Sequence, residues 1–392
     1  MSLVENLLAN ALWGAVFLVS GTISATSGAC AVALNYGSDV VTAIKLALGI
    51  EKPIAPEAHG VTDKQWELLA SDDAPHYLRE YARFGCDDDL RLPAFLEAAK
   101  VLTLASTLSY ATEADANQLL DKQAASWTAK LVESETKRAQ VMLLMTTAND
   151  RNKSPSTGSA AASPIVVLAF RGTELPDDDK EGLREFFPDW WRNLYFVPKP
   201  VPGRGKVAKG FFEAWNGSPD DVKVLKTEAL RTIHKFSDTC GDKTVDLFVT
   251  GHSGGGALAH VSLLDLLQLQ RDGDTSFKLR GCMTLAQPRF CDKEYADNVI
   301  HGMKHIPLDL IANEDVTGVD PVVALGGPWT TVPPGRFWKV RVDQVFAGPS
   351  TCCAHVRTAQ PPLLVLARRL AMSLPLHWTG GRVGYLAALC SG

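Results

Sequence analysis

The residues with the clearest chemical potential lie in one short segment, Gly251-His252-Ser253-Gly254-Gly255. A serine with glycine two positions before and two after it is typical of a sharp turn from a strand into a helix, because a side chain at either glycine would crowd the backbone. Such a turn raises the serine hydroxyl above the sheet and directs the first helical N–H groups at it. Those groups can stabilise the oxyanion of a tetrahedral intermediate. The pattern predicts Ser253 as a nucleophile.

The flanking sequence supplies the elements that this turn requires. An apolar run at 245–250 is typical of a buried strand, and an Ala/Leu-rich stretch at 257–269 is typical of a helix. Further strand-like runs occupy 140–145, 165–170, 310–312 and 338–342. Strands that alternate with helices predict a largely parallel sheet covered on both faces. The fold class is therefore α/β, of the α/β-hydrolase type, and a mainly helical stretch at 61–135 predicts a helical N-terminal extension. A passive serine in a glycine-rich turn is the alternative.

A serine nucleophile needs an acid and a histidine, which follow it in that chain order in this architecture. Glu314, Asp315 and Asp320 are the acid candidates, since they follow a predicted strand, and Asp315 lies nearest to its end. Only His355 and His377 come after these acids among the nine histidines. Chain order alone leaves both choices open.

Several segments together resemble the class 3 lipase family, in order and at plausible separations. They lie at 166–173 (ending Phe-Arg-Gly-Thr), 189–194, 205–211, 250–259 and 284–289. The resemblance covers about residues 100–390 and implies a serine lipase that cleaves acylglycerol esters through an acyl-enzyme. A phospholipase A, a general carboxylesterase, an esterase or peptidase acting on non-lipid bonds, and an inactive membrane-bound lipid-binding protein are the alternatives. This chemistry requires neither a cofactor nor a metal, so none is expected.

The resemblance also implies roles for particular residues. The N–H group of Gly254 supplies the first half of the oxyanion hole, and Thr173 supplies the second through its N–H group, with its hydroxyl as a further option. The segment that begins at Asp320 resembles the family's acid segment and favours it over Asp315. His377 is favoured as the base because Tyr385-Leu386 lies downstream, as in the family's ending.

Two departures from the family pattern bear on the substrate. Gly254 stands where a leucine is usual, and Ala208 stands where a histidine is common. The missing side chain at 254 makes the pocket rim more open or more flexible, so the shape of the substrate stays undecided. The family also places a lid after the Phe-Arg-Gly-Thr corner. Residues 174–191 suit a lid that opens at a lipid interface, since the first half of the segment is acidic and its end is rich in aromatic residues. Packing of these aromatic residues against the domain is the alternative.

The N-terminal segment, residues 1–60, is set apart by its apolar character. No charged residue occurs from Asn6 to Ser38, and the most apolar part, residues 7–23, is close to the length of a membrane-spanning helix. A membrane anchor or interfacial helix, a cleaved signal and a packing helix all fit. A Pro-rich joint at 52–56 separates this segment from a predicted catalytic domain at 61–392. Localisation is accordingly membrane-associated or secreted.

Composition excludes several other classes of protein. A net charge of −5 gives no basic footprint, so a nucleic-acid partner is not expected. The eight cysteines form no C-x-x-C pair, which disfavours a zinc ribbon or a thioredoxin-like site. Disulfide pairing and oligomeric state cannot be deduced from the spacing.

Overall fold

The computed structural model describes just over half of the 392-residue chain. The described residues are 63–71, 73–84, 91–123, 127–134, 139–146, 163–172, 197–219, 221–241, 243–315, 318–319, 336–341 and 344–348. The predicted N-terminal apolar helix, Thr173, the predicted lid at 174–191, Asp320 and His377 all lie outside these residues. Among the described helices, none combines the length and the apolar character that a membrane span requires.

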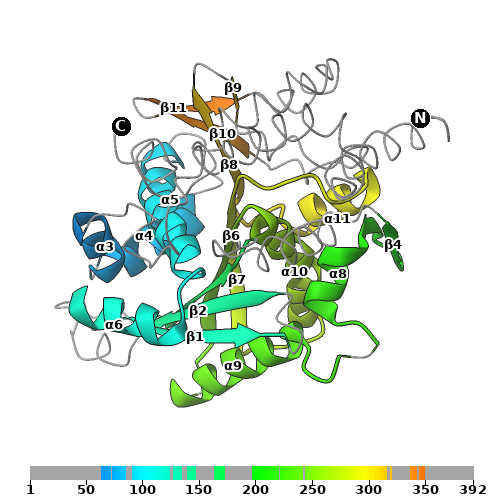
Figure 1. Cartoon of the computed structure of the whole chain (residues 1–392), viewed down its shortest axis with the longest axis horizontal. Coiled ribbons are helices and arrows are strands. Elements are labelled where there is room, and N and C mark those ends of the chain that lie inside the picture. Colours follow the sequence, from blue (N-terminus) through cyan, green and yellow to red (C-terminus); the bar gives the residue numbers. More distant parts are fainter. Residues whose placement is uncertain are drawn as a thin grey trace, which may run out of the picture.

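A nine-stranded sheet forms the centre of the described part (Figure 1). Its order is β1-β2-β3-β6-β7-β8-β10-β11, and β9 pairs with β8. The bounds are β1 Trp127–Glu133, β2 Gln140–Thr146, β3 Ile165–Phe170, β6 Val245–His252, β7 Phe277–Leu285, β8 Leu308–Asp315, β9 Gly318–Val319, β10 Arg336–Arg341 and β11 Gln344–Gly348. The central pairs from β3 to β10 are parallel, and the outer pairs are antiparallel.

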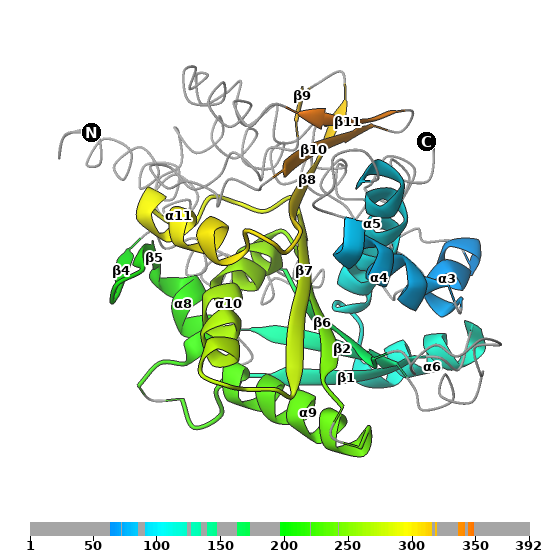
Figure 2. The same ribbon diagram turned by 180° about the vertical axis from the view of Figure 1, so that it is seen from behind.

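Helices cover both faces of this sheet (Figures 1 and 2). One face carries α8 (Lys209–Asn216), α9 (Leu225–Thr239), α10 (Gly254–Arg271) and α11 (Lys293–Gly302). The other carries α3 (Asp63–Ala70), α4 (Ala74–Phe84), α5 (Arg91–Leu108) and α6 (Glu113–Gln123). The predicted fold class, α/β with a mostly parallel central sheet flanked by helices, is confirmed. A separate hairpin joins β4 (Pro198–Val201) to β5 (Gly205–Ala208).

The strand β3 shows why both faces can be apolar. All six of its residues are buried. Val166, Leu168 and Phe170 pack in the core on the side of α8–α11, and the alternate residues pack in the core on the side of α3–α6. Side chains alternate between the faces of a strand, so a strand buried on both sides reads as a continuous apolar run.

The predicted helical stretch at 61–135 is wrong at its end. Helix α6 stops at Gln123, and Trp127–Glu133 form β1, which pairs antiparallel with β2. The burial of β1 alternates from Trp127 to Lys130, which is the period of a strand packed on one face. A seven-residue strand that follows helix-forming residues directly is easily read as more helix.

The helix α4 is fastened to the sheet by a buried polar contact. The Tyr81 hydroxyl donates to Asp309 Oδ2 on β8 at 2.6 Å and lies 3.3 Å from the carbonyl oxygen of Cys282 on β7. A Cβ atom at Gly281 would lie 2.7 Å from the Tyr81 ring, so this glycine makes room for it. The N-terminal helices therefore pack as an integral layer of the described fold.

Candidate active site

Ser253 lies at the turn between the buried strand β6 and the helix α10. Its backbone has φ 55° and ψ −128°, a left-handed φ that non-glycine residues rarely adopt. Two hydrogen bonds hold it there. The Ser253 N–H donates to the carbonyl oxygen of Leu285 at 2.9 Å, and the Gly256 N–H donates to the Ser253 carbonyl oxygen at 2.9 Å. This is the strained strand-to-helix turn that the motif predicts.

The glycines of the turn are required by space. A Cβ atom at Gly251 would lie 2.5 Å from the carbonyl carbon of Gly255. A Cβ atom at Gly255 would collide with the carbonyl oxygen of Phe170 and lie 2.8 Å from the carbonyl carbon of Arg171. The start of α10 is thereby pressed against the end of β3.

The strand β3 brings the predicted oxyanion corner to Ser253. It runs parallel to β6, with Phe170 opposite Gly251. A Cβ atom at Gly172 would lie 2.6 Å from the His252 carbonyl oxygen and 3.2 Å from Ser253 Cβ. Gly172 is thus in contact with the nucleophile's turn, and Thr173, the predicted donor, is the next residue along the chain. Gly254, the other predicted donor, is the first residue of α10.

The acid candidates follow a strand that ends at the same edge of the sheet. β8 is parallel to β7, which is parallel to β6, so the carboxyl end of β8 lies at the edge that carries Ser253. Asp315 is the last residue of β8, and Asp320 follows β9 directly. The side chain of Asp315 lies outside the described residues, as do Asp320 and His377, so all three remain predictions.

The structure adds a residue that the sequence analysis missed. Tyr110 follows the helix α5, and its hydroxyl lies 2.9 Å from Nδ1 of His252, the residue before the nucleophile. The Gly172 N–H donates to the same hydroxyl. Burial raises the pKa of Tyr110 far above its usual range, although Arg171, 5.9 Å from its ring, opposes that shift. Tyr110 belongs to no motif around Ser253, and an aromatic residue after an apolar helix is its only signal in the sequence.

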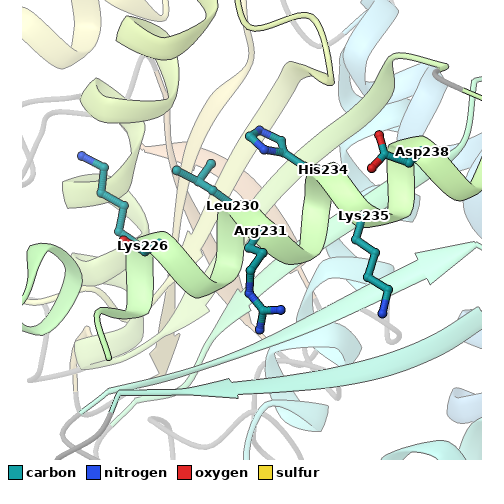
Figure 3. Close-up of a pocket in the computed structure, with 7 residues that line it drawn as sticks. Lys226, Leu230, Arg231, His234, Lys235 and Asp238 are labelled. Carbon is teal, nitrogen blue, oxygen red and sulfur yellow. The ribbon is translucent and has the colours of Figure 1, made fainter. Parts of the chain in front are cut away.

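A hollow elsewhere on the surface is distinct from this site. It has a volume of about 520 Å³, and its lining residues come from α9 alone. Figure 3 shows side chains that line it projecting from this helix, among them Lys226, Arg231 and Lys235. No residue of the Ser253 turn contributes to it, so it is not the place where the nucleophile meets a substrate.

Comparison with known proteins identifies the segment that carries this geometry. Residues 167–319 match the family model described as lipase (class 3). The predicted resemblance is confirmed over this segment. It includes most of β3, the Ser253 turn and β8, and the match confirms the prediction of a lipase-type serine ester hydrolase. No curated protein matches the chain significantly.

Solved lipase structures share a distant likeness with the chain. The Rhizomucor miehei triacylglyceride lipase is 18% identical, with 78% of this chain and 97% of that chain covered and a TM-score of 0.45. Lipase II from Rhizopus niveus is 14% identical, with 69% and 92% covered and a TM-score of 0.46. The lipase from Rhizopus microsporus var. chinensis is 16% identical, with 78% and 84% covered and a TM-score of 0.39.

Proposed function

We propose that this protein is a serine lipase that cleaves acylglycerol esters through an acyl-enzyme on Ser253. The observation that carries the proposal is the strained turn at Ser253, in a segment that matches the class 3 lipases. Backbone strain of this kind is typical of functional sites, because surrounding contacts must hold it in place. Here those contacts come from β3, β7 and α10.

The proposed reaction assigns one role to each predicted residue. His377 takes the proton of the Ser253 hydroxyl as its oxygen attacks the ester carbonyl, and Asp320 holds the imidazole in the required tautomer. The N–H groups of Gly254 and Thr173 stabilise the oxyanion. The alcohol leaves with the proton from His377, and water, activated by the same imidazole, then releases the fatty acid.

The positions of described elements support these assignments. Ser253 lies at the N-terminus of the 18-residue helix α10, where the helix dipole favours developing negative charge. Gly172, in contact with the turn, precedes Thr173. β8 leads its acid candidates to the same edge of the sheet. The assignment of Asp320 rather than Asp315 rests on the likeness of its segment to the family's acid segment.

The lipid interface is part of the same proposal. Residues 174–191 form the lid, whose aromatic end carries Phe186, Phe187, Trp190 and Trp191. A lid of this composition exposes apolar area when it opens, and contact with lipid offsets that exposure. The N-terminal apolar segment is proposed to associate with the membrane. Phospholipid and short-chain ester substrates are the alternatives that an assay must separate.

The test compares the full-length protein with Ser253→Ala on three substrates: emulsified triacylglycerol, phospholipid vesicles and a soluble short-chain ester. We expect the highest wild-type rate on the emulsion and a fall of about a thousandfold or more in kcat for Ser253→Ala, because the nucleophile is lost. A fluorophosphonate should label the wild-type protein and not the variant.

Ser262→Ala is the matched control for this test. Ser262 is a buried serine on the same helix, and its hydroxyl donates to the Ala259 carbonyl oxygen at 2.7 Å. This variant should keep wild-type labelling and turnover. A wild-type protein that is not labelled and hydrolyses none of the three substrates would contradict the proposal. If phospholipid is turned over faster than triacylglycerol, the proposed substrate class changes from acylglycerol to phospholipid.

A further inference from the structure

The helix α5 packs against β6, the strand that leads to Ser253. The Ser106 hydroxyl lies 3.0 Å from the Thr250 hydroxyl on β6, and Thr250 also donates to the Leu102 carbonyl oxygen at 3.4 Å. Ser106 and Thr250 are both fully buried. Two buried hydroxyl groups therefore fix α5 to the strand three residues before the nucleophile.

Tyr110, which follows α5, makes a further contact at the edge of the sheet that carries Ser253. Its hydroxyl meets His252 Nδ1 at 2.9 Å, and the two rings are packed edge to face with centroids 6.1 Å apart. The same oxygen accepts the Gly172 N–H. One phenol thus contacts the ends of two neighbouring parallel strands, β3 and β6, at the point where each leads to an oxyanion donor.

We infer that Tyr110 is a positioning residue of the oxyanion hole. Its hydroxyl links Gly172, the residue before Thr173, to His252, which precedes Ser253 and Gly254. This inference rests on the proposed function, since it assigns Tyr110 a part in the same ester hydrolysis. Tyr110 lies outside residues 167–319, so the N-terminal helices contribute directly to the site.

The hydrogen-bonding capacity of a phenol suits this role. The hydroxyl has one proton and two lone pairs, so it can accept the Gly172 N–H and donate to His252 Nδ1 at once. His252 then carries its own proton on Nε2. Burial raises the pKa of Tyr110, so the hydroxyl stays protonated at any pH at which a serine hydrolase works.

The packing around Gly172 shows how tightly this contact is built. A Cβ atom there would collide with the Tyr110 hydroxyl and lie 3.2 Å from Ser253 Cβ. Oxyanion donors act only when they are held in place before the reaction, and a displacement of about 1 Å can cost a hundredfold in rate. Loss of the Tyr110 hydroxyl frees both strand ends from their shared partner.

The test is Tyr110→Phe in the full-length protein, assayed on a soluble ester so that the interface does not limit the rate. We expect kcat to fall about 10- to 100-fold with KM changed less than about threefold, because the donors matter most in the transition state. The affinity for an alkyl boronic acid, which forms a tetrahedral adduct with the serine, should fall by a similar factor.

Ser106→Ala is the matched control, since it removes a buried hydroxyl contact between the same helix and the same strand. It should lower the melting temperature and leave kcat and the boronic acid affinity at wild-type values. Wild-type kcat in Tyr110→Phe, or an equal fall of kcat in both variants, would overturn the inference.

A second pair of variants covers the case in which Tyr110→Phe does not fold. In His252→Asn the amide oxygen can accept the Tyr110 proton near the place of Nδ1, whereas His252→Leu has no acceptor. We expect kcat of the asparagine variant to exceed that of the leucine variant by about tenfold, and equal values contradict the inference. Ser253→Ala tests the nucleophile separately, so its outcome distinguishes failure of the proposed function from failure of this inference.

Discussion

Ser253 and Ala286 share a backbone conformation that is costly for residues with a side chain. Their φ angles are 55° and 51°, and among the described residues no other non-glycine residue has a positive φ. Ser253 follows β6 and Ala286 follows β7, so both strained residues lie at one edge of the sheet. Each such residue costs about 1–3 kcal/mol and persists only where neighbours hold it. In Ala286 the N–H donates to the Ile311 carbonyl oxygen at 3.0 Å.

The acid of the triad can be identified by two single substitutions. Asp320→Asn should lower kcat by about ten-thousandfold, because an amide at the acid position favours the wrong imidazole tautomer. Asp315→Asn should keep most of the activity. Both are measured as kcat on the soluble ester, with far-UV circular dichroism as a check on folding. The reverse result would move the acid to Asp315.

Prediction from the sequence succeeded where the chemistry depends on neighbours along the chain. The turn at Ser253 is set by glycines within two residues of it, so a local pattern is enough. Tyr110 meets His252 across 142 residues, and no local pattern marks that contact. For the triad acid and base, only chain order and family resemblance narrowed the choice among the candidate residues. Contacts between distant segments are therefore the part of the site that the sequence could not supply.

At the scale of elements, the buried strands were predicted well and the edge strand β1 was not. Every residue of β3 and β6 is buried, and both strands are rich in apolar residues: β3 is continuously apolar, and β6 is apolar at Val245 and from Leu247 to Val249. This composition makes their type clear. β1 is a strand of only seven residues close to the end of α6, with alternating burial at its start, so the predicted helical stretch extended into it. The order of the strands and the placing of α3–α6 on one face depend on contacts that no single segment displays.

The docking of α4 can be tested through its buried hydroxyl. Tyr81→Phe removes the donor to Asp309 and should lower the free energy of unfolding by about 2 kcal/mol, since a buried carboxylate loses a hydrogen bond. Urea denaturation followed by circular dichroism measures the change. Tyr77→Phe, on the same helix with a half-buried ring, is the control and should change stability by less than about 0.5 kcal/mol. Equal effects would mean that the Asp309 contact adds nothing.

For the whole molecule, a buried histidine on α10 links stability to acidity. His260 is fully buried, and neither ring nitrogen has a hydrogen-bond partner in the part of the chain that the structure describes. Burial lowers its pKa from 6.5 to about 3. The unfolded chain therefore binds a proton more readily than the folded protein below pH 6.5, so acid favours unfolding. The contribution of neutral His260 to the free energy of unfolding is fully present above pH 6.5 and is lost as the pH falls toward 3.

The measurement is the free energy of unfolding of the wild-type protein and of His260→Leu at several pH values. Between about pH 7 and about pH 5 the wild-type protein should lose about 2 kcal/mol more than the variant, from about 1.4 kcal/mol per pH unit below the unfolded pKa. The difference between the two proteins isolates this residue from the carboxyl groups, which titrate in both. Parallel curves would show that His260 does not couple folding to protons.

The contact of Tyr110, which follows α5, with the Ser253 turn limits which parts of related enzymes can be joined in a chimera. The segment that matches the lipase family begins at residue 167, whereas the helix that leads to Tyr110 ends almost sixty positions earlier. A chimera that takes its first hundred or so residues from another source would inherit Ser253 and the glycines intact. It would nevertheless need a hydroxyl at position 110 and a glycine at position 172 from compatible parents. The two stretches of sequence are therefore expected to be inherited as a unit, although only one of them carries the family's signature.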